Sequence, residues 1–135
     1  DKKGIETTSK PYDDIVILNK LHEHGIKIGA FTNANIHRAE IEAALVSPHI
    51  KQNLVSAQDF KTLKPDPTGL FKLMEKLKAD KDTTAFVGNG DEDILTAKNA
   101  GVTSIRIYRG EHQIKYVRED FTIRNLYELL ELIGH

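Results

Sequence analysis

Short apolar runs alternate along this chain with segments whose apolar residues repeat at helical spacing, and this alternation restricts the fold more than any other feature. Strand-like runs occupy residues 26–31, 53–55, 84–88 and 102–108. Helical patterns run from Pro11 to a cap at Gly25, over 36–45, 68–78 and 92–100 with a cap at Gly101, and through Leu126, Leu129, Leu130 and Ile133. Strands separated by helices favour parallel pairing through right-handed crossovers. The sequence therefore predicts an α/β domain with a doubly wound parallel sheet.

The composition indicates a single domain and limits its class of partner. A chain of 135 residues can bury a core without disulfides or structural metals. Its 19 basic and 20 acidic residues give a net charge of -1, with no attraction for nucleic acid or an anionic membrane. The absence of cysteine excludes disulfides, thiolate zinc sites and cysteine nucleophiles. With no apolar run near the roughly 20 residues of a membrane span and no signal-peptide core in residues 1–8, we expect a cytoplasmic domain over 1–135.

Polar residues follow two of the predicted strands at their carboxyl ends. Thr32 and Asn33 come after the 26–31 run, and Asn89 comes after the 84–88 run. Between them in sequence lies Lys64, in a loop stiffened by two prolines. Ligands of open α/β sheets sit outside the carboxyl ends of the strands. Hydroxyl and N–H groups bind phosphate oxygens, lysine adds positive charge, and hard oxygen ligands suit Mg²⁺. We therefore expect these residues to converge on one site.

Three stretches, in this order, resemble motifs of the haloacid dehalogenase-like (HAD) hydrolases. The second motif resembles KIGAFTNAN (27–35), and the third resembles KPDPTGLF (64–71). The fourth, Gly-Asp-x-x-x-Asp, resembles VGNGDEDILTAKNAG (87–101). The resemblance runs from about Lys10 to the C-terminus. It implies a Rossmann-like core that cleaves a phosphate monoester of a small metabolite through an aspartyl-phosphate, with Mg²⁺ as cofactor.

The resemblance also implies roles for individual residues. Thr32 would bind the phosphoryl group together with Asn33, and Lys64 would stabilise the developing negative charge. Asn89 and Asp93 would lie on the metal side. Because Asn89 stands where the family has an aspartate, the resemblance implies weaker metal binding: an amide oxygen ligates Mg²⁺ without charge.

The family's first motif, Asp-x-Asp-Gly-Thr at the end of an apolar strand, has no good match. Residues 1–6 place Asp1 and Gly4 at fitting offsets, but Lys3 stands at the second aspartate and no apolar strand precedes it. Lysine cannot supply carboxyl acid–base chemistry at neutral pH. We expect the nucleophile and its strand to be lost from this chain or supplied elsewhere: by a separate segment, by a partner chain, or by a longer protein of which this is a fragment. In the family that strand lies between those leading to Thr32 and Asn89, so we expect a gap or a substitute at the centre of the sheet.

Simpler interpretations of each motif remain open. Residues 87–93 also suit a glycine-rich turn whose acids favour a helix N-terminus. Thr32 and Asn33 suit a helix N-cap, and Lys64 suits a solvated surface position. Residues 33–63 are too few to hold a cap domain beside their own helix. Two functions follow: a phosphohydrolase core, or a non-catalytic HAD-like domain that binds a ligand or partner.

Overall fold

The strands of the computed structural model form two small parallel sheets. The structure describes residues 17–33, 52–60, 63–110 and 115–132, together with positions 37 and 41. One sheet pairs β1 (Ala30–Thr32) with β2 (Leu54–Ser56). The other has the order β3 (Ala85–Gly88), β4 (Thr103–Ile107), β5 (Phe121–Ile123). Every pairing is parallel, which confirms the predicted α/β fold.

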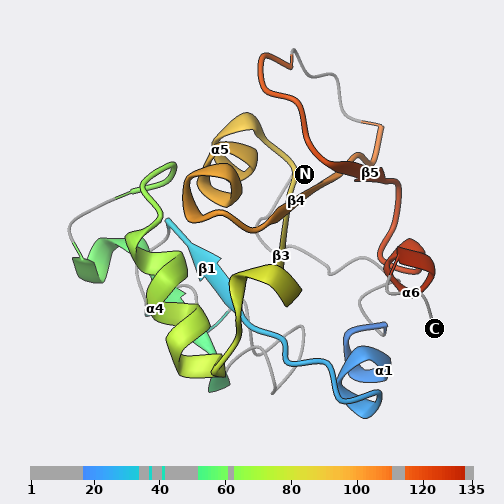
Figure 1. The fold of residues 1–135 in the computed structure, drawn as a ribbon, viewed down its shortest axis with the longest axis horizontal. Coiled ribbons are helices and arrows are strands. Elements are labelled where there is room, and N and C mark those ends of the chain that lie inside the picture. The colour runs from blue at the N-terminus through green and yellow to red at the C-terminus, as the bar shows by residue number, and fades with distance from the viewer. Residues whose placement is uncertain are drawn as a thin grey trace.

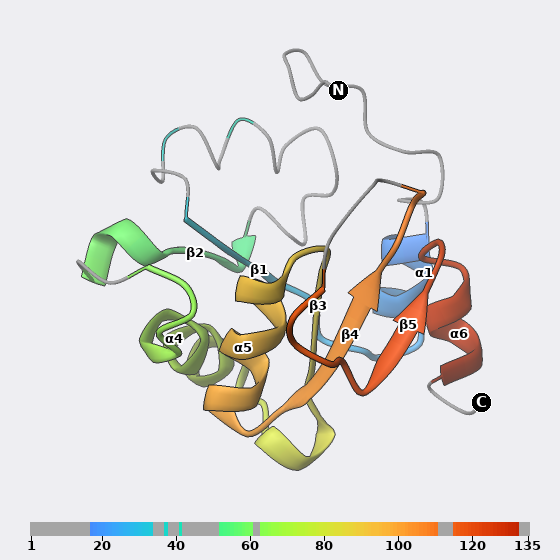
Figure 2. The same ribbon diagram turned by 90° about the horizontal axis from the view of Figure 1, so that it is seen from above.

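Helices cover the strands from two sides. The described α-helices are α1 (Ile17–Glu23), α4 (Thr68–Leu77), α5 (Asp91–Ala100) and α6 (Glu128–Leu132). Helices α4 and α5 lie on one side of the strands, while α1 and α6 lie on the other (Figures 1 and 2). Each side has its own apolar cluster: Phe31 with Leu70 and Ala97 on the first, and Leu21 with Ile105 on the second. None of the described helices is long and apolar enough to cross a membrane.

The ends of α4 and α5 follow from local sequence. Asp66 Oδ1 accepts a hydrogen bond of 2.8 Å from the Thr68 N–H where α4 begins, and α4 ends at Lys78 in a left-handed conformation (φ 55°). Gly90 is the N-cap of α5, and Gly101 ends that helix at φ 77°. A positive φ is favourable only for glycine and a few polar residues, so Gly101 is the C-cap that the sequence predicted.

The strand predicted over 26–31 is shorter in the structure and displaced toward its carboxyl end. Its ladder begins at Ala30, which pairs with Leu54, and ends at Thr32, which pairs with Ser56. Strand β2 extends only over these three positions, so residues 26–29 have no described strand beside them. The apolar pattern predicted that a strand exists here, but the length of its neighbour β2 determines where β1 begins and ends.

Strand β5 was not predicted from the sequence, which was interpreted there as a polar loop. It has three residues, too few to show the alternation of apolar and polar residues that predicts a strand. Long-range contacts align it with β4: the Asp120 N–H donates to Ser104 O (3.0 Å), and Asp120 Oδ2 accepts from the Ser104 N–H (2.8 Å). This pairing across the chain, rather than local propensity, makes the strand.

Other predicted elements agree within a few residues or lie outside the described part. The strands predicted over 53–55, 84–88 and 102–108 appear as 54–56, 85–88 and 103–107. The helix over 36–45 falls outside the described residues, apart from helical positions 37 and 41. The first helix is described from Ile17, and Gly25 follows it at φ 84°.

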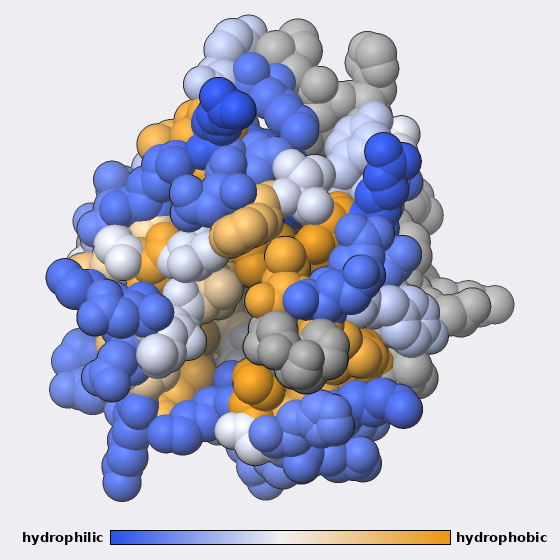
Figure 3. Space-filling view, turned by 45° about the vertical axis from the view of Figure 1, so that its right-hand side comes forward, coloured by the Kyte–Doolittle hydropathy of each residue, from blue (hydrophilic) through white to orange (hydrophobic). Residues whose placement is uncertain are grey.

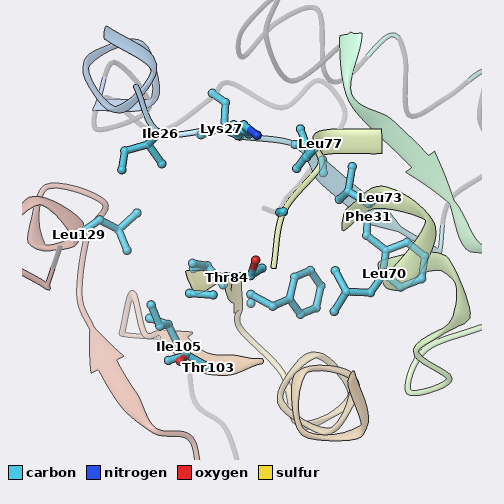
Figure 4. Close-up of a pocket in the computed structure, with 18 of the residues that line it drawn as sticks. Ile26, Lys27, Phe31, Leu70, Leu73, Leu77, Thr84, Thr103, Ile105 and Leu129 are labelled. Atoms are coloured by element: carbon cyan, nitrogen blue, oxygen red, sulfur yellow. The ribbon is translucent and has the colours of Figure 1, made fainter. Parts of the chain in front are cut away.

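A large cavity separates the two sheets. Within the described residues β1 pairs only with β2, and β3 pairs only with β4, so the two strands do not share a ladder. The cavity between them has a volume of about 1090 Å³. Side chains from α4, β4 and α6 surround it, including Leu73, Ile105 and Leu129 (Figure 4). The face drawn in Figure 3 shows apolar side chains gathered in the middle, with hydrophilic ones around them.

Candidate functional site

A lysine and an aspartate from distant parts of the chain meet beyond the carboxyl ends of β1 and β3. Lys64 Nζ lies 2.6 Å from Asp93 Oδ1, and the two side chains are only 12% and 10% exposed. At this distance the pair forms a charge-assisted hydrogen bond. Removing one partner of such a buried pair typically costs about 3–5 kcal/mol, because the other charge is left uncompensated. The ion pair therefore fixes the Lys64 loop against the start of α5.

Asp93 is held in place by its own turn. Its Oδ2 accepts hydrogen bonds from the N–H groups of Asn89 (3.2 Å) and Gly90 (3.4 Å). Gly88 leaves room for this carboxylate, since a Cβ at that position would lie 2.3 Å from Asp93 Cβ and 2.4 Å from Oδ2. One carboxylate oxygen is thus directed at the turn, and the other is left for Lys64.

Hydrogen bonds from two sides tie down the Lys64 loop. The Lys64 N–H donates to Asn33 Oδ1 (3.0 Å), just after β1. Asn33 O in turn accepts from Gln58 Nε2 (2.9 Å). On the other side, Asn99 of α5 donates through Nδ2 to Pro65 O (3.0 Å). The loop is therefore positioned by the residue that follows β1 and by α5 before its side chain reaches Asp93.

Two aromatic rings flank the Lys64 ammonium. Its Nζ lies 5.8 Å from the Phe31 ring centroid and 5.7 Å from that of Phe86, and the two rings are 6.3 Å apart. Cation–π contacts at this range are worth about 0.5–2 kcal/mol. Phe31 itself packs directly on α4, where a Cβ at Gly69 would lie 2.1 Å from its ring. The lysine charge is thus held by one residue from β1 and one from β3.

The other predicted site residues lie at the same strand ends. Thr32 is the last residue of β1, next to Asn33. Asn89 follows β3 directly and is exposed, and its N–H is used by Asp93. The structure thus brings Lys64 into direct contact with both Asn33 and Asp93. Thr32 precedes Asn33 in the chain, and the Asn89 N–H donates to Asp93 Oδ2.

A buried arginine lies on the other side of the 89–91 turn. Arg106 of β4 is 1% exposed, and it donates through Nη2 to Asp91 Oδ1 (2.7 Å) and through Nε to Glu119 Oε1 (2.8 Å). A hydrogen bond from the Tyr116 N–H, followed by that from Arg106, holds the pKa of Asp91 below its usual value. Burial raises the pKa of Glu119, but hydrogen bonds from Thr122 and Arg106, among others, outweigh it and lower the pKa to about 2. Both carboxylates are therefore charged around neutral pH.

The oxygen donors at the turn are of the kind that binds Mg²⁺. Among the described residues, no group of three or more His, Cys, Asp or Glu side chains is arranged to hold a metal ion. The carboxylate of Asp93 and the amide of Asn89 are the predicted donors. Mg²⁺ commonly takes one or two carboxylates and completes its shell with phosphate oxygens and water. Because a carboxylate has about four lone-pair sites, the hydrogen bonds to Asp93 leave room for such an ion.

Comparison with known proteins identifies the family. Residues 1–107 match the sequence model of the haloacid dehalogenase-like hydrolases. The chain belongs to this family. The resemblance carried by the motifs around Thr32, Lys64 and Asn89 is thereby confirmed at the level of the family.

Relatives within the HAD-like hydrolases are longer than this chain. The pyrophosphatase PpaX of Halalkalibacterium halodurans is 32% identical over 130 residues, which are 93% of this chain and 60% of the relative. The glyceraldehyde 3-phosphate phosphatase of Methanopyrus kandleri is 30% identical over 132 residues, with 92% and 57% covered. A HAD phosphatase crystal structure from Thermococcus onnurineus superposes with a TM-score of 0.78 at 28% identity, over 91% of this chain and 58% of that one. The chain thus spans between 57 and 60% of these HAD-like proteins.

Sequence reasoning missed several residues of the site in this HAD-like chain. Arg106 could have been recognised, because it is a lone arginine inside an apolar predicted strand. A buried arginine almost always has a charged or polar partner, so its position predicts such a partner. Its partner Glu119 lies in a polar stretch and gave no such signal. Asn99 and the ring of Phe86 also gave none, since only the folded chain brings them to the Lys64 loop.

We expect Gly88→Ala to disturb the site far more than Gly90→Ala, although both change one turn by one methyl group. The Cβ at position 88 meets Asp93, whereas nothing lies within 4 Å of a Cβ at position 90. Overpacking costs about 1–3 kcal/mol, and alanine in place of glycine at an N-cap costs up to about 1 kcal/mol. Urea unfolding measures both costs, and the amide shift of Gly90 reports displacement of the Asp93 carboxylate. Equal losses from the two variants would contradict the close approach of Gly88 to Asp93.

Proposed function

We propose that this chain forms the core of a phosphohydrolase that cleaves the phosphate monoester of a small metabolite with the help of Mg²⁺. The observation that carries the proposal is the Lys64–Asp93 pair beyond the carboxyl ends of β1 and β3, where ligands of open α/β sheets bind. Two of the similar proteins are named as phosphatases, and a third as a pyrophosphatase, which supports the same class of reaction.

In this proposal the residues after β1 and the lysine bind the phosphoryl group. The Lys64 ammonium has three N–H donors, of which one points at Asp93. The others offer charge-assisted hydrogen bonds to phosphoryl oxygens, and they act in a site where burial reduces screening by water. Thr32 supplies a hydroxyl at the end of β1, and Asn33 fixes the Lys64 backbone. Lys64 thus stabilises negative charge as it develops.

Asp93 and Asn89 would hold Mg²⁺ on the side of the turn, where the ion neutralises charge on the phosphoryl oxygens. Only one of these two residues carries a charge. Because ligand charge count tunes affinity at hard-cation sites, the ion should be held weakly. The oxygen that Asp93 shares with Lys64 also keeps the lysine charge close to the metal side.

The reaction needs a nucleophile, which we propose to lie on a further parallel strand between β1 and β3. Its aspartate oxygen would bond to phosphorus as the alcohol leaves, and water would then hydrolyse the aspartyl-phosphate. The cavity of about 1090 Å³ between these strands supports this arrangement. The strand would come from another segment of the protein or from a partner chain.

Backbone directions favour a strand in this cavity. The Ala30 N–H donates to Asn53 O beside β2 (2.9 Å), so the backbone groups of Phe31, one residue along, point toward the cavity. Thr84 O accepts from the Thr103 N–H at the β4 edge, and by the same alternation those of Val87 point into the cavity. Buried backbone groups without partners cost about 1–3 kcal/mol each. A strand between them would satisfy both edges.

A non-catalytic binding domain is the second candidate. Asn89 in place of an aspartate favours it, as do the three hydrogen bonds that already engage Asp93. Such a domain would bind a phosphorylated ligand through Lys64 without cleaving it.

Replacing Lys64 with methionine should weaken binding of inorganic phosphate by about 10–100-fold, because a hydrogen bond to a charged group contributes about 1.5–3 kcal/mol. Lys72→Met is the matched control, since Lys72 is exposed on α4 and its ammonium is paired with Glu75 (3.8 Å). Calorimetry measures the binding. Release of phosphate from an aryl phosphate with Mg²⁺, measured with the segment or partner that supplies the additional strand present, separates the two candidates. Release supports the hydrolase, and binding without release supports the binding domain. If Lys64→Met and Lys72→Met bind phosphate equally, Lys64 does not belong to the site.

Asn89→Asp should tighten Mg²⁺ binding by about tenfold, because it adds a charged oxygen ligand beside Asp93. Asn125→Asp makes the same change of net charge in the loop before α6, where the residue's Oδ1 accepts from the Glu128 N–H (3.2 Å) and an aspartate could do the same. Titration calorimetry with Mg²⁺ compares the two. An unchanged or weaker affinity in Asn89→Asp would show that Asn89 is not at the metal position.

Amide hydrogen exchange tests the additional strand. The sample is the protein purified from its own cells with any segment or partner that it carries there. In it, the N–H groups of Phe31 and Val87 should be protected from exchange as strongly as that of Ile105, which lies in the central strand of its sheet. Fast exchange at Phe31 and Val87 beside a slow Ile105 would mean that no strand fills the cavity.

A further inference from the structure

Arg106 is the largest side chain among the fully buried residues, and its guanidinium contacts two separate parts of the chain. Toward the 89–91 turn it donates through Nη1 to Asn89 O (3.3 Å) and through Nη2 to Asp91 Oδ1 (2.7 Å). Toward the connection between β4 and β5 it donates to Val117 O (2.7 Å) and Glu119 Oε1 (2.8 Å). Making all four contacts at once uses Nε, Nη1 and Nη2 of the planar guanidinium, and a single lysine ammonium cannot reproduce this set.

Stability alone explains this arrangement poorly. Taking a guanidinium and its carboxylates out of water costs several kcal/mol per ion, and replacing such clusters with apolar residues is often neutral or stabilising. Arg106 lies in β4 between the buried Ile105 and the half-buried Ile107. An apolar side chain could fill this buried position without the cost of removing a charge from water. An apolar residue could make none of the four hydrogen bonds, and two of them, to Asn89 O and Asp91 Oδ1, reach the 89–91 turn.

The 89–91 turn is consequently held by hydrogen bonds on both sides. On one side, Asp93 accepts the N–H groups of Asn89 and Gly90. On the other, Arg106 binds the carbonyl of Asn89 and the carboxylate of Asp91. The remaining oxygen of that carboxylate, Asp91 Oδ2, accepts from the Tyr116 N–H (2.8 Å). The backbone between residues 89 and 91 therefore has little freedom to rotate.

We propose that Arg106 is a positioning residue that fixes the 89–91 turn, and with it the oxygen donors of Asn89 and Asp93, by anchoring the turn to the connection between β4 and β5. The proposal rests on the proposed function for the role of the two donors, but the order of the turn itself can be measured without any ligand. In Figure 2 the chain after residue 114 runs past the first turn of α5 before it enters β5, which is where these contacts lie.

A second buried polar cluster on the same strand supplies a matched control. Ser104 lies two residues before Arg106 and so faces the same side of β4. It is fully buried, and its hydroxyl donates to Asp120 Oδ2 (3.1 Å). None of the hydrogen bonds described for Ser104 reaches the 89–91 turn. Ser104→Ala therefore removes a polar contact of β4 without removing any hydrogen bond of Arg106.

The test compares Arg106→Lys with Ser104→Ala by amide hydrogen exchange and by Mg²⁺ titration. In Arg106→Lys, exchange at Asn89 and Gly90 should accelerate at least tenfold more than at Ile105, and Mg²⁺ affinity should fall by about 10–100-fold, as is typical when partners of metal ligands are lost. Ser104→Ala should accelerate the three amides by similar factors and leave Mg²⁺ affinity unchanged.

Asp91→Asn provides a second variant, which keeps the shape of the side chain and leaves Arg106 paired with Glu119. It should also accelerate exchange at Asn89 and Gly90 selectively, and it decides the matter alone if Arg106→Lys does not fold. Uniform acceleration in the folded variants would overturn the proposal and leave Arg106 a structural residue. If the unsubstituted protein binds neither Mg²⁺ nor inorganic phosphate, the proposed function fails, while selective exchange at the turn would still support the anchor.

Discussion

The ion pair between Lys64 and Asp93 is the interaction on which the site depends. Within the described residues the two sheets share no ladder, so their carboxyl ends are joined by side chains instead. Lys64 reaches from a loop tied to β1, and Asp93 lies in the first turn of the helix that follows β3. The tilted rings of Phe31 and Phe86 add a second link beneath the ammonium. The same contacts therefore fix the geometry of the site and connect the two sheets.

A half-buried lysine and a buried arginine lie on opposite sides of one short turn. Lys64 contacts the turn through Asp93, and Arg106 contacts it through Asn89 and Asp91. Their chemistry suits different tasks. Lysine is a flexible point charge with donors to spare, which suits a group that meets a ligand. Arginine makes several directional hydrogen bonds at once, which suits a group that holds the backbone still.

Asn89 departs from the family pattern in its charge. It removes one carboxylate from the turn. The positive charge of the site, by contrast, is present at the half-buried Lys64. A strand in the cavity between β1 and β3 would carry the proposed nucleophile and would restore the balance of charge around the lysine. This links the proposed strand to electrostatics as well as to backbone hydrogen bonding.

The sequence by itself determined the alternation of helices and strands and the caps at Gly25 and Gly101, because periodicity and the steric freedom of glycine act within a few residues. Through the motifs it also singled out Lys64 and Asp93, which the structure places 2.6 Å apart. Only the tertiary structure decided the limits of β1, the existence of β5 and the partners of Arg106. Those features depend on segments far apart in the chain, and no local pattern records which segment will lie beside which. The sequence shows a charged residue, Arg106, inside an apolar strand, where charged residues are rare. Only the folded structure shows which residues compensate its charge.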